Sequence, residues 1–171
     1  MRIYLIGFMG TGKTTLGAKV AGMVNVPFID TDHMIELQEG ISISQLFASR
    51  GEDEFRHIEA SVLRSTSSYD KALIATGGGL PVYHNNMDWL LDHGITMYLN
   101  WPEDILVANL MQHRSIRPLL SELTVEAATK KAISLLEERR PVYERSSMTL
   151  EMKGDVEVDN QTLEKACSYI W

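Results

Sequence analysis

Short apolar runs alternate with longer stretches of helical periodicity along the chain. The apolar runs, bounded by Gly, Pro or Asp, predict strands at Ile3–Ile6, Phe28–Ile29, Leu73–Ala75, Thr96–Leu99 and near Met148–Leu150. The periodic stretches predict helices at about Lys13–Val24, Asp32–Glu39, Ser42–Ala48, Glu52–Ser65, Met87–Asp92, Glu103–Met111, Val125–Arg139 and Leu163–Ile170. This alternation is typical of β-α units, so we expect a three-layer α/β/α fold around a central, mostly parallel, five-stranded sheet.

Two of these helices carry end signals of their own. Ser42 followed by Gln45 matches a capping box at a helix start. Thr124 precedes an apolar periodic run and is a suitable N-cap, and Pro141 is expected to close that same helix because proline has no N–H for the helical ladder. Local chemistry and periodicity therefore agree for both helices.

The 171 residues fit a single domain, residues 1–171, because no repeat, low-complexity stretch or linker-like tract divides them. The segment Gln112–Ile116 differs from the rest: it is polar and basic, and it lacks an apolar face. It stands directly before Arg117-Pro118-Leu119-Leu120. We therefore expect a mobile lid loop at about residues 112–116.

Composition narrows the class of protein. A hydrophobic content of 44% can build a core without disulfides, and Cys167, the only cysteine, is expected to be a small apolar residue of the last helix. The start of the chain enters a strand-like segment rather than a signal peptide, so we expect a cytoplasmic protein that does not cross a membrane. Sixteen basic against 23 acidic residues give a net charge of −7, which excludes a general binder of nucleic acid or anionic membranes.

A phosphate-binding pattern follows the first predicted strand. Gly7-Phe8-Met9-Gly10-Thr11-Gly12-Lys13-Thr14 matches G-x-x-x-x-G-K-[ST] and opens a helix, as the mechanism requires. Lys13 would reach the β- and γ-phosphates of a nucleotide, and the Thr14 hydroxyl would bind Mg²⁺. Backbone N–H groups would converge on the β-phosphate from Gly10, Thr11, Gly12, Lys13, Thr14 and Thr15. The alternative is a glycine-rich turn with an incidental lysine.

Two carboxylates follow the second predicted strand. If the backbone stays extended to Asp32, then Asp30 and Asp32 share a face, where one could bind a metal through water and the other accept a proton from an attacking hydroxyl. The alternative is that Asp32 is only the N-cap of the helix that begins there.

Further candidate residues are spread along the chain. Arg56 and Glu59 lie one turn apart on a predicted helix, where Arg56 either anchors a carboxylate substrate or pairs with Glu52 in solvent. Gly77-Gly78-Gly79 follows a strand and either approaches a ligand closely or forms a turn before a proline. Arg117 and Arg139 are each open to an ordinary explanation as a loop cation or a helix-end cation.

Taken in chain order, these pieces resemble the shikimate kinase family over about residues 3–145. The pieces are the phosphate loop, Asp30-Thr31-Asp32, Phe47 to Gly51 with Glu54-Phe55-Arg56-x-x-Glu59, Gly77-Gly78-Gly79, Arg117-Pro118-Leu119-Leu120 and Arg139-x-Pro141-x-Tyr143. The resemblance implies a P-loop fold like that of nucleoside monophosphate kinases. It also implies a monomer that transfers the γ-phosphoryl group of ATP to the 3-hydroxyl of shikimate, in the biosynthesis of chorismate and aromatic amino acids.

The family also implies a role for each matching residue. Asp32 would bind the shikimate hydroxyls and act as base, with Asp30 in the Mg²⁺ shell. Within a helical acceptor region at about residues 32–65, Arg56 supported by Glu59 would bind the shikimate carboxylate together with Arg139. Backbone donors would come from Gly78 and Gly79, and Arg117 would be the lid arginine that reaches the phosphates.

One position departs from the family. The family often has an arginine packed on adenine seven residues before Arg117, where this chain has Leu110, and Arg114 is a possible substitute. Two other functions compete with the one that the resemblance implies. One is a kinase of another small metabolite, such as gluconate, and the other is a nucleotide-dependent binding module without catalysis.

Overall fold

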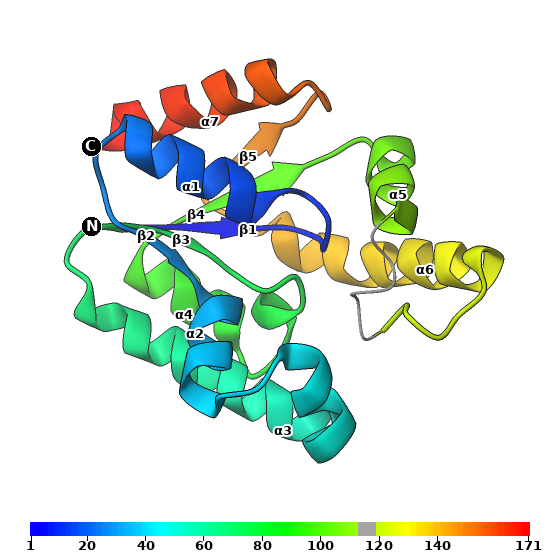
Figure 1. Cartoon of the computed structure of the whole chain (residues 1–171). Coiled ribbons are helices and arrows are strands. Elements are labelled where there is room, and N and C mark those ends of the chain that lie inside the picture. Colours follow the sequence, from blue (N-terminus) through cyan, green and yellow to red (C-terminus); the bar gives the residue numbers. More distant parts are fainter. Residues whose placement is uncertain (113–118) are drawn as a thin grey trace.

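The computed structural model describes residues 1–112 and 119–171 and contains one five-stranded sheet. The strand order is β2-β3-β1-β4-β5 and every neighbouring pair is parallel (Figure 1). In chain order the strands are β1 Arg2–Ile6, β2 Phe28–Asp30, β3 Ala72–Ala75, β4 Ile95–Asn100 and β5 Met148–Glu151. The predicted α/β fold with a parallel five-stranded sheet is confirmed.

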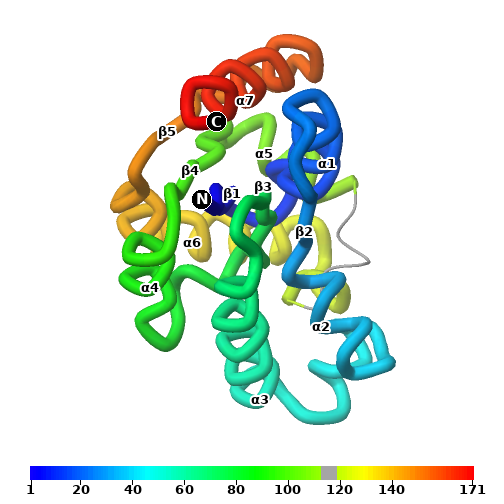
Figure 2. The backbone as a smooth tube through the Cα atoms, turned by 90° about the vertical axis from the view of Figure 1, so that its left-hand side faces the viewer, coloured from blue at the N-terminus to red at the C-terminus, as the bar shows by residue number. Residues whose placement is uncertain are grey.

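Helices cover both faces of this sheet. On one face lie α1 (Lys13–Met23) and α7 (Val156–Ile170), and on the other lie α3 (Ile43–Ser65), α4 (Asn86–His93) and α6 (Val125–Tyr143) (Figures 1 and 2). The remaining elements are α2 (Thr31–Glu39), which packs on α3, α5 (Glu103–Gln112), which packs on α6, and the 3-10 turns η1 (Thr66–Ser68) and η2 (Leu80–Val82). These layers leave the carboxyl ends of the strands facing α2, α3, α5 and α6.

Alternation along the central strand divides the core in two. Ile3 and Leu5 pack with residues of α1 and α7, whereas Tyr4 and Ile6 pack with residues of α3, α4, α5 and α6. All four side chains are fully buried. Because successive residues of a strand point to opposite faces, this one apolar run supplies both cores and holds the following loop between them.

The two helices expected on either side of Gly51 are confirmed: both lie within α3, separated at Gly51 by a non-helical kink with φ 81° and ψ 174°. Two other predicted helix ends need correction. Pro141 does not close α6, which runs on to Tyr143, because the buried Tyr143 ring anchors this last turn in the core. Helix α7 begins at Val156 and not at Leu163, since Asp155 caps its first turn by accepting bonds from the N–H groups of Glu157 and Val158. The capping box at Ser42 and the cap at Thr124 are confirmed.

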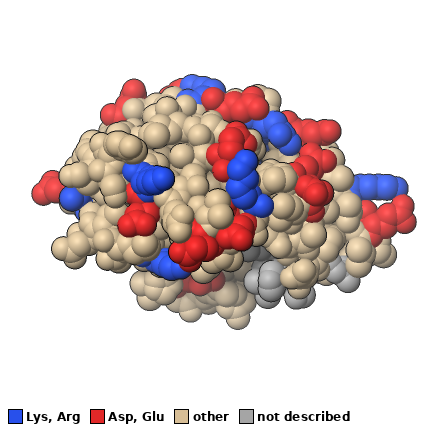
Figure 3. Space-filling model, turned by 90° about the horizontal axis from the view of Figure 1, so that it is seen from above, with Lys and Arg blue, Asp and Glu red and all other residues tan. Residues whose placement is uncertain are grey.

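The surface agrees with the acidic composition. On the face formed by α1 and α7, acidic and basic side chains of the described residues are interspersed, without one continuous basic area (Figure 3). Within residues 1–112 and 119–171, no helix has the length and apolar character needed to span a bilayer.

Candidate active site

The phosphate loop connects β1 to α1 and has the conformation that its sequence predicts. Gly10 and Gly12 adopt positive φ values of 83° and 72°, which are strained for residues with a side chain. A Cβ at Gly10 would lie 2.9 Å from Leu110 Cδ2 of α5, so the loop also needs a small residue there. The alternative of an incidental lysine after a turn is disfavoured, because the side chain of Lys13, the first residue of α1, bonds back to the loop.

Lys13 is buried and folds back over the loop. Its Nζ donates to the carbonyl oxygens of Gly7 at 2.7 Å and Phe8 at 2.8 Å and to Thr11 Oγ1 at 3.2 Å. These acceptors fix the position of the ammonium group against the loop. A cation held in this way beside the N-terminus of α1 favours the binding of an anion such as a nucleotide phosphate.

Asp30 ends β2 and is the true cap of α2. Its Oδ1 accepts hydrogen bonds from the N–H groups of Asp32 at 2.9 Å and His33 at 3.4 Å, and its Oδ2 accepts from the Thr14 hydroxyl at 2.6 Å. The hypothesis that the extended backbone continues to Asp32 is wrong, because α2 begins at Thr31, and so is the alternative that Asp32 is the cap. Because Asp32 lies in the first turn of α2, it does not continue the strand that ends at Asp30.

A divalent cation fits this corner of the loop. The Thr14 hydroxyl and the Asp30 carboxylate lie side by side, and both are oxygen ligands of the type that Mg²⁺ prefers. Among the described residues, no group of three or more His, Cys, Asp or Glu side chains could enclose a metal ion. The donor set therefore suits a metal that takes most of its ligands from phosphate and water, as Mg²⁺ does.

A pocket of about 270 Å³ adjoins the phosphate loop on the side of α2 and α3. It combines apolar walls with two arginines and three acidic side chains. The lining residues are Met9, Asp32, Glu36, Ile43, Ser44, Phe47, Phe55, Arg56, Glu59, Gly77, Gly78, Gly79, Leu119 and Arg139. A pocket of this size and charge suits a small, polar, acidic metabolite.

Arg56 enters this pocket from α3, held by two carboxylates. Its Nη1 donates to Glu59 Oε2 at 3.2 Å and its Nη2 donates to Glu52 Oε1 at 2.7 Å. Both of the pairs considered from the sequence are therefore present at once: Arg56 is only 5% exposed, whereas the Glu52 side chain is 41% exposed, so this pair meets solvent only on the Glu52 side. Burial lowers the pKa of Arg56, and the two carboxylates more than reverse this, so the guanidinium stays charged.

Glu59 is a buried carboxyl group of the pocket with a shifted pKa. Burial and the neighbouring Asp32 carboxylate raise its pKa to about 7, against the opposing effect of Arg56. The first-turn residue Asp32 and the α3 residue Glu59 approach each other across Gly77: a Cβ on Gly77 would lie 2.5 Å from Glu59 Oε1 and 2.7 Å from Asp32 Oδ1. The proximity of the Asp32 carboxylate is thus one cause of the raised pKa of Glu59.

The three glycines after β3 leave room for this arrangement. A Cβ on Gly78 would lie 2.9 Å from the backbone nitrogen of Met9, and one on Gly79 would lie 2.7 Å from Arg56 Nη1. The backbone here therefore approaches both the phosphate loop and the arginine directly. The turn before Pro81 that the sequence offered is present, and the 3-10 turn η2 follows it immediately. The close approach seen here is to protein atoms, and approach to a ligand stays a prediction.

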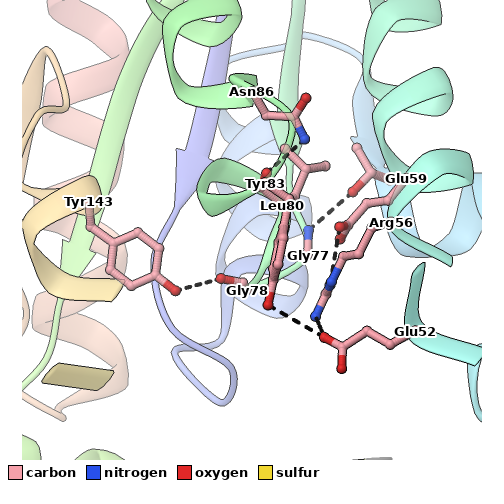
Figure 4. Close-up of polar contacts among 10 residues, drawn as sticks. Glu52, Arg56, Glu59, Gly77, Gly78, Leu80, Tyr83, Asn86 and Tyr143 are labelled. Atoms are coloured by element: carbon pink, nitrogen blue, oxygen red, sulfur yellow. Dashed lines mark hydrogen bonds and ion pairs between the residues drawn. The ribbon is translucent and has the colours of Figure 1, made fainter. Parts of the chain in front are cut away.

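Arg139 reaches the same pocket from the far end of α6. It is 2% exposed and lies over the Phe8 ring, with the guanidinium carbon 5.8 Å from the ring centroid. Its Nε is buried and has no hydrogen-bond partner among the residues that the structure describes. One turn further along α6, the Tyr143 hydroxyl donates to the Gly78 carbonyl (Figure 4). Helix α6 is thus fixed to the glycine segment, with a buried guanidinium directed into the pocket.

A second pocket of about 550 Å³ lies over the phosphate loop. The two pockets share three lining residues, Met9, Asp32 and Gly78. The second pocket is lined in addition by Gly10, Gly12, Lys13, Thr14, Thr15, Asp30, Thr76, Asn109, Leu110 and Val156. The phosphate-binding groups and the arginine pocket therefore face each other across a common wall that contains the Asp32 carboxylate.

Some predicted and contributing residues need separate mention. Arg117, Arg114 and residues 113–116 of the expected lid lie outside the described residues, so their roles stay predictions. Leu110, at the position where the family often has an arginine, is buried and lines the pocket over the phosphate loop. Val156 also lines this pocket, although no sequence pattern pointed to it, because it stands beyond the recognisable motifs.

Comparisons with known proteins agree with this geometry. A family model for shikimate kinase matches residues 9–169. The shikimate kinase of Parabacteroides distasonis is 37% identical over 150 residues, which cover 88% of this chain and 87% of that protein. The crystal structure of the Bacteroides thetaiotaomicron shikimate kinase superposes with a TM-score of 0.88 at 34% identity, covering 98% of both chains.

Two further structures mark the limits of the likeness. A shikimate kinase from Acinetobacter baumannii in complex with shikimate gives a TM-score of 0.87 at 33% identity, covering 98% of this chain and 93% of that one. A gluconokinase from Sinorhizobium meliloti gives 0.62 at 17% identity and shares the fold alone. With a family model spanning most of its length and relatives above 30% identity, the chain belongs to the shikimate kinase family.

Proposed function

We propose that the chain transfers the γ-phosphoryl group of ATP to the 3-hydroxyl of shikimate, with ATP in the pocket over the phosphate loop and shikimate in the adjoining arginine pocket. The observation that carries this proposal is the common wall: Asp32 lines both pockets, between Lys13 on one side and Arg56 on the other. Phosphoryl transfer requires chiefly in-line positioning and neutralisation of charge, and this arrangement supplies both.

On the nucleotide side, the phosphates would bind the N-terminus of α1. Backbone donors would be those of Gly10, Thr11, Gly12, Lys13, Thr14 and Thr15, and all of these except Thr11 line the pocket. Lys13 would exchange its contacts with the Gly7 and Phe8 carbonyls for phosphate oxygens, which accept stronger, charge-assisted hydrogen bonds. Its charge then lies where negative charge accumulates during transfer.

The metal would be Mg²⁺, held by the Thr14 hydroxyl and, directly or through water, by Asp30. When bound, it would supply neutralisation of the β- and γ-phosphate charge. The chain's own contribution is orientation: the N-terminus of α2 holds Asp30 through Oδ1 and leaves Oδ2 directed at Thr14.

On the acceptor side, the shikimate carboxylate would bind Arg56 and Arg139, which enter the pocket from α3 and α6. Glu59 would hold Arg56 in place, and the backbone N–H groups of Gly78 and Gly79 would donate to the substrate. Asp32 would accept the proton of the attacking hydroxyl, because it is the carboxylate that also lines the phosphate side. The mixed lining of apolar and charged groups matches a small cyclic acid that carries hydroxyl groups.

The proposal is tested by measuring ADP release from ATP and Mg²⁺ with shikimate, with gluconate or without acceptor. We expect release with shikimate only, because a paired arginine site has no partner in the absence of a correctly placed carboxylate. Release with gluconate alone would favour the other small-metabolite kinase. No release with any acceptor, from folded protein that binds ATP, would favour the non-catalytic binding module.

We also propose that residues 1–171 form one kinase domain that works as a monomer. The single sheet supports one domain, because the core clusters on its two faces are built around the same strands, and the monomer is what the family resemblance implies. Sedimentation equilibrium of the purified chain, with and without ATP and shikimate, tests it, and a stable dimer would contradict it.

A further inference from the structure

The guanidinium of Arg56 has an aromatic neighbour that does not belong to the substrate pocket. The Arg56 guanidinium carbon lies 4.3 Å from the centroid of the Tyr83 ring, closer than to the rings of Phe55 at 5.2 Å or Phe47 at 5.9 Å. Tyr83 comes from the turn between η2 and α4, whereas both phenylalanines belong to α3. At this distance a tyrosine ring attracts a cation, more strongly where the cation is removed from water.

Tyr83 and Arg56 also share a carboxylate. Glu52 Oε1 accepts from Arg56 Nη2 at 2.7 Å and lies 3.5 Å from the Tyr83 hydroxyl (Figure 4). Glu59 holds the other terminal nitrogen, Nη1, from the inner side. With both terminal nitrogens held, Arg56 Nε remains a buried donor without a partner among the described residues.

A third pocket of about 500 Å³ lies on the outer side of this arginine, lined by Glu52, Asp53, Arg56, His57, Tyr83 and His84. Arg56 lines both this outer pocket and the substrate pocket, whereas Tyr83 and Glu52 line only the outer one. The two residues therefore contact the arginine from behind without lining the space for the acceptor. Any effect that they have on the acceptor must pass through Arg56.

The turn that carries Tyr83 is held in a strained conformation. His84 and Asn85, the two residues after Tyr83, adopt positive φ values of 51° and 54°. Such conformations persist in residues other than glycine only when surrounding contacts impose them.

The contacts around this turn come from Asn86 and Arg64. The Asn86 N–H donates to the Tyr83 carbonyl at 2.9 Å, and its side-chain amide donates to the Leu80 carbonyl at 2.8 Å. Arg64 Nη1 donates to Asn86 Oδ1 at 2.7 Å. The turn is thus fixed on both sides of Tyr83, which fixes where its ring meets Arg56.

We propose that Tyr83 is a positioning residue of the acceptor site. Its ring holds the Arg56 guanidinium against α3 and covers part of it on the side of the outer pocket, and its hydroxyl keeps Glu52 on Nη2. Arg56 therefore meets the acceptor carboxylate in one orientation and with little water around it, which strengthens a charge-assisted contact. The inference rests on the proposed function, in which Arg56 binds the carboxylate of shikimate.

The test combines Tyr83→Leu with Arg56→Ala in a double-mutant cycle, with kcat/KM for shikimate and for ATP measured for each variant. We expect Tyr83→Leu to lower kcat/KM for shikimate about tenfold, mostly through KM, the factor that corresponds to loss of a desolvated cation–π contact. KM for ATP should not change. In the Arg56→Ala background, Tyr83→Leu should have no further effect on shikimate, because the residue through which it acts is gone.

Two conservative variants and a control separate positioning from folding. Tyr83→Phe keeps the ring, so it should retain most of the wild-type kcat/KM for shikimate. Glu52→Gln leaves the aromatic contact in place and should raise KM for shikimate severalfold. Tyr169→Leu changes a tyrosine that is 89% exposed and should leave all constants unchanged. Circular dichroism and thermal unfolding of each variant confirm that the compared proteins are folded.

The outcomes distinguish this inference from the proposal on which it rests. An unchanged KM for shikimate in folded Tyr83→Leu, or an equal loss in the presence and absence of Arg56, would overturn the positioning role while leaving the proposed function intact. If Tyr83→Leu does not fold, Tyr83→Met takes its place as a variant that removes the ring, and an unchanged KM for shikimate in that variant has the same meaning. An unchanged KM in Arg56→Ala itself would instead remove Arg56 from the acceptor site, and the role of Tyr83 with it.

Discussion

The phosphate loop and the arginine pocket adjoin each other but are built in opposite ways. The loop is one contiguous segment whose cation, Lys13, is held by backbone carbonyls. The arginine pocket is assembled from α2, α3, the glycine segment and α6, and its cation Arg56 is held by carboxylates that are themselves partly or fully buried. Side-chain changes in the loop should therefore affect chemistry, whereas changes in the pocket should affect chemistry and stability together, because they leave buried charges unpaired.

The largest effect should come from Asp32, whose carboxylate lines both pockets. Asp32→Asn removes the proposed base while nearly preserving shape, so we expect kcat to fall by roughly 10²–10⁴, the range for loss of general base catalysis, with little change in KM for ATP. Steady-state assays of ADP release measure both constants. Asp53→Asn, an exposed change on α3, is the matched control. An undiminished kcat in Asp32→Asn would show that another group accepts the proton.

The next largest effect should come from Arg139 and should be absent for its neighbour in α6, Arg140. Arg139 is buried in the arginine pocket, whereas Arg140 is partly exposed and pairs with Glu103 at 3.4 Å. Arg139→Leu should raise KM for shikimate by roughly 10- to 100-fold, the value of one lost charge-assisted contact, with KM for ATP unchanged. Arg140→Leu should leave both constants nearly unchanged, since surface pairs contribute little. Equal effects of the two changes would remove Arg139 from the acceptor site.

The two regions also differ in how far the sequence could predict them. The strand-loop-helix pattern of the phosphate loop predicts its fold, its position and the roles of Lys13 and Thr14, because all the information is local. For the arginine pocket, each residue alone had an ordinary explanation, and only the order of the motifs favoured a site. The local pattern was also misleading at Asp30 and Asp32, where the helix begins one residue earlier than expected.

Other features could not be predicted because they depend on contacts between distant segments. Tyr83 and Glu52 carry no motif, and their meeting at Arg56 follows from the packing of the η2–α4 turn on α3. The continuation of α6 past Pro141 depends on the burial of Tyr143 and its bond to Gly78. Tertiary packing decided these cases, and a residue-by-residue pattern does not contain it.

A glycine substitution tests the close packing of the arginine pocket through its effect on the free energy of unfolding. A Cβ on Gly77 would meet Glu59 and Asp32 at 2.5 and 2.7 Å, whereas nothing lies within 4 Å of a Cβ on Gly22 in α1. We expect Gly77→Ala to destabilise the protein by about 1–3 kcal/mol, as overpacking does, and to raise KM for shikimate. Gly22→Ala should stabilise it by about 0.5–1 kcal/mol, because alanine favours a helix. Urea unfolding measures both, and equal stabilities would contradict the close packing at Gly77.

The last comparison concerns a pH dependence of stability that belongs to the arginine pocket. Burial raises the pKa of Glu59 from 4.5 in the unfolded chain to about 7, so between these values the native state holds a proton that the unfolded state has lost. The free energy of unfolding should therefore fall as pH rises across this window, by at most about 1.4 kcal/mol per pH unit. Glu59→Gln cannot ionise, so its stability relative to wild type should increase from pH 5 to pH 7 and level off above. Urea unfolding at several pH values measures the difference, in which the contributions of all other groups cancel, and parallel curves would mean that Arg56 keeps Glu59 ionised throughout.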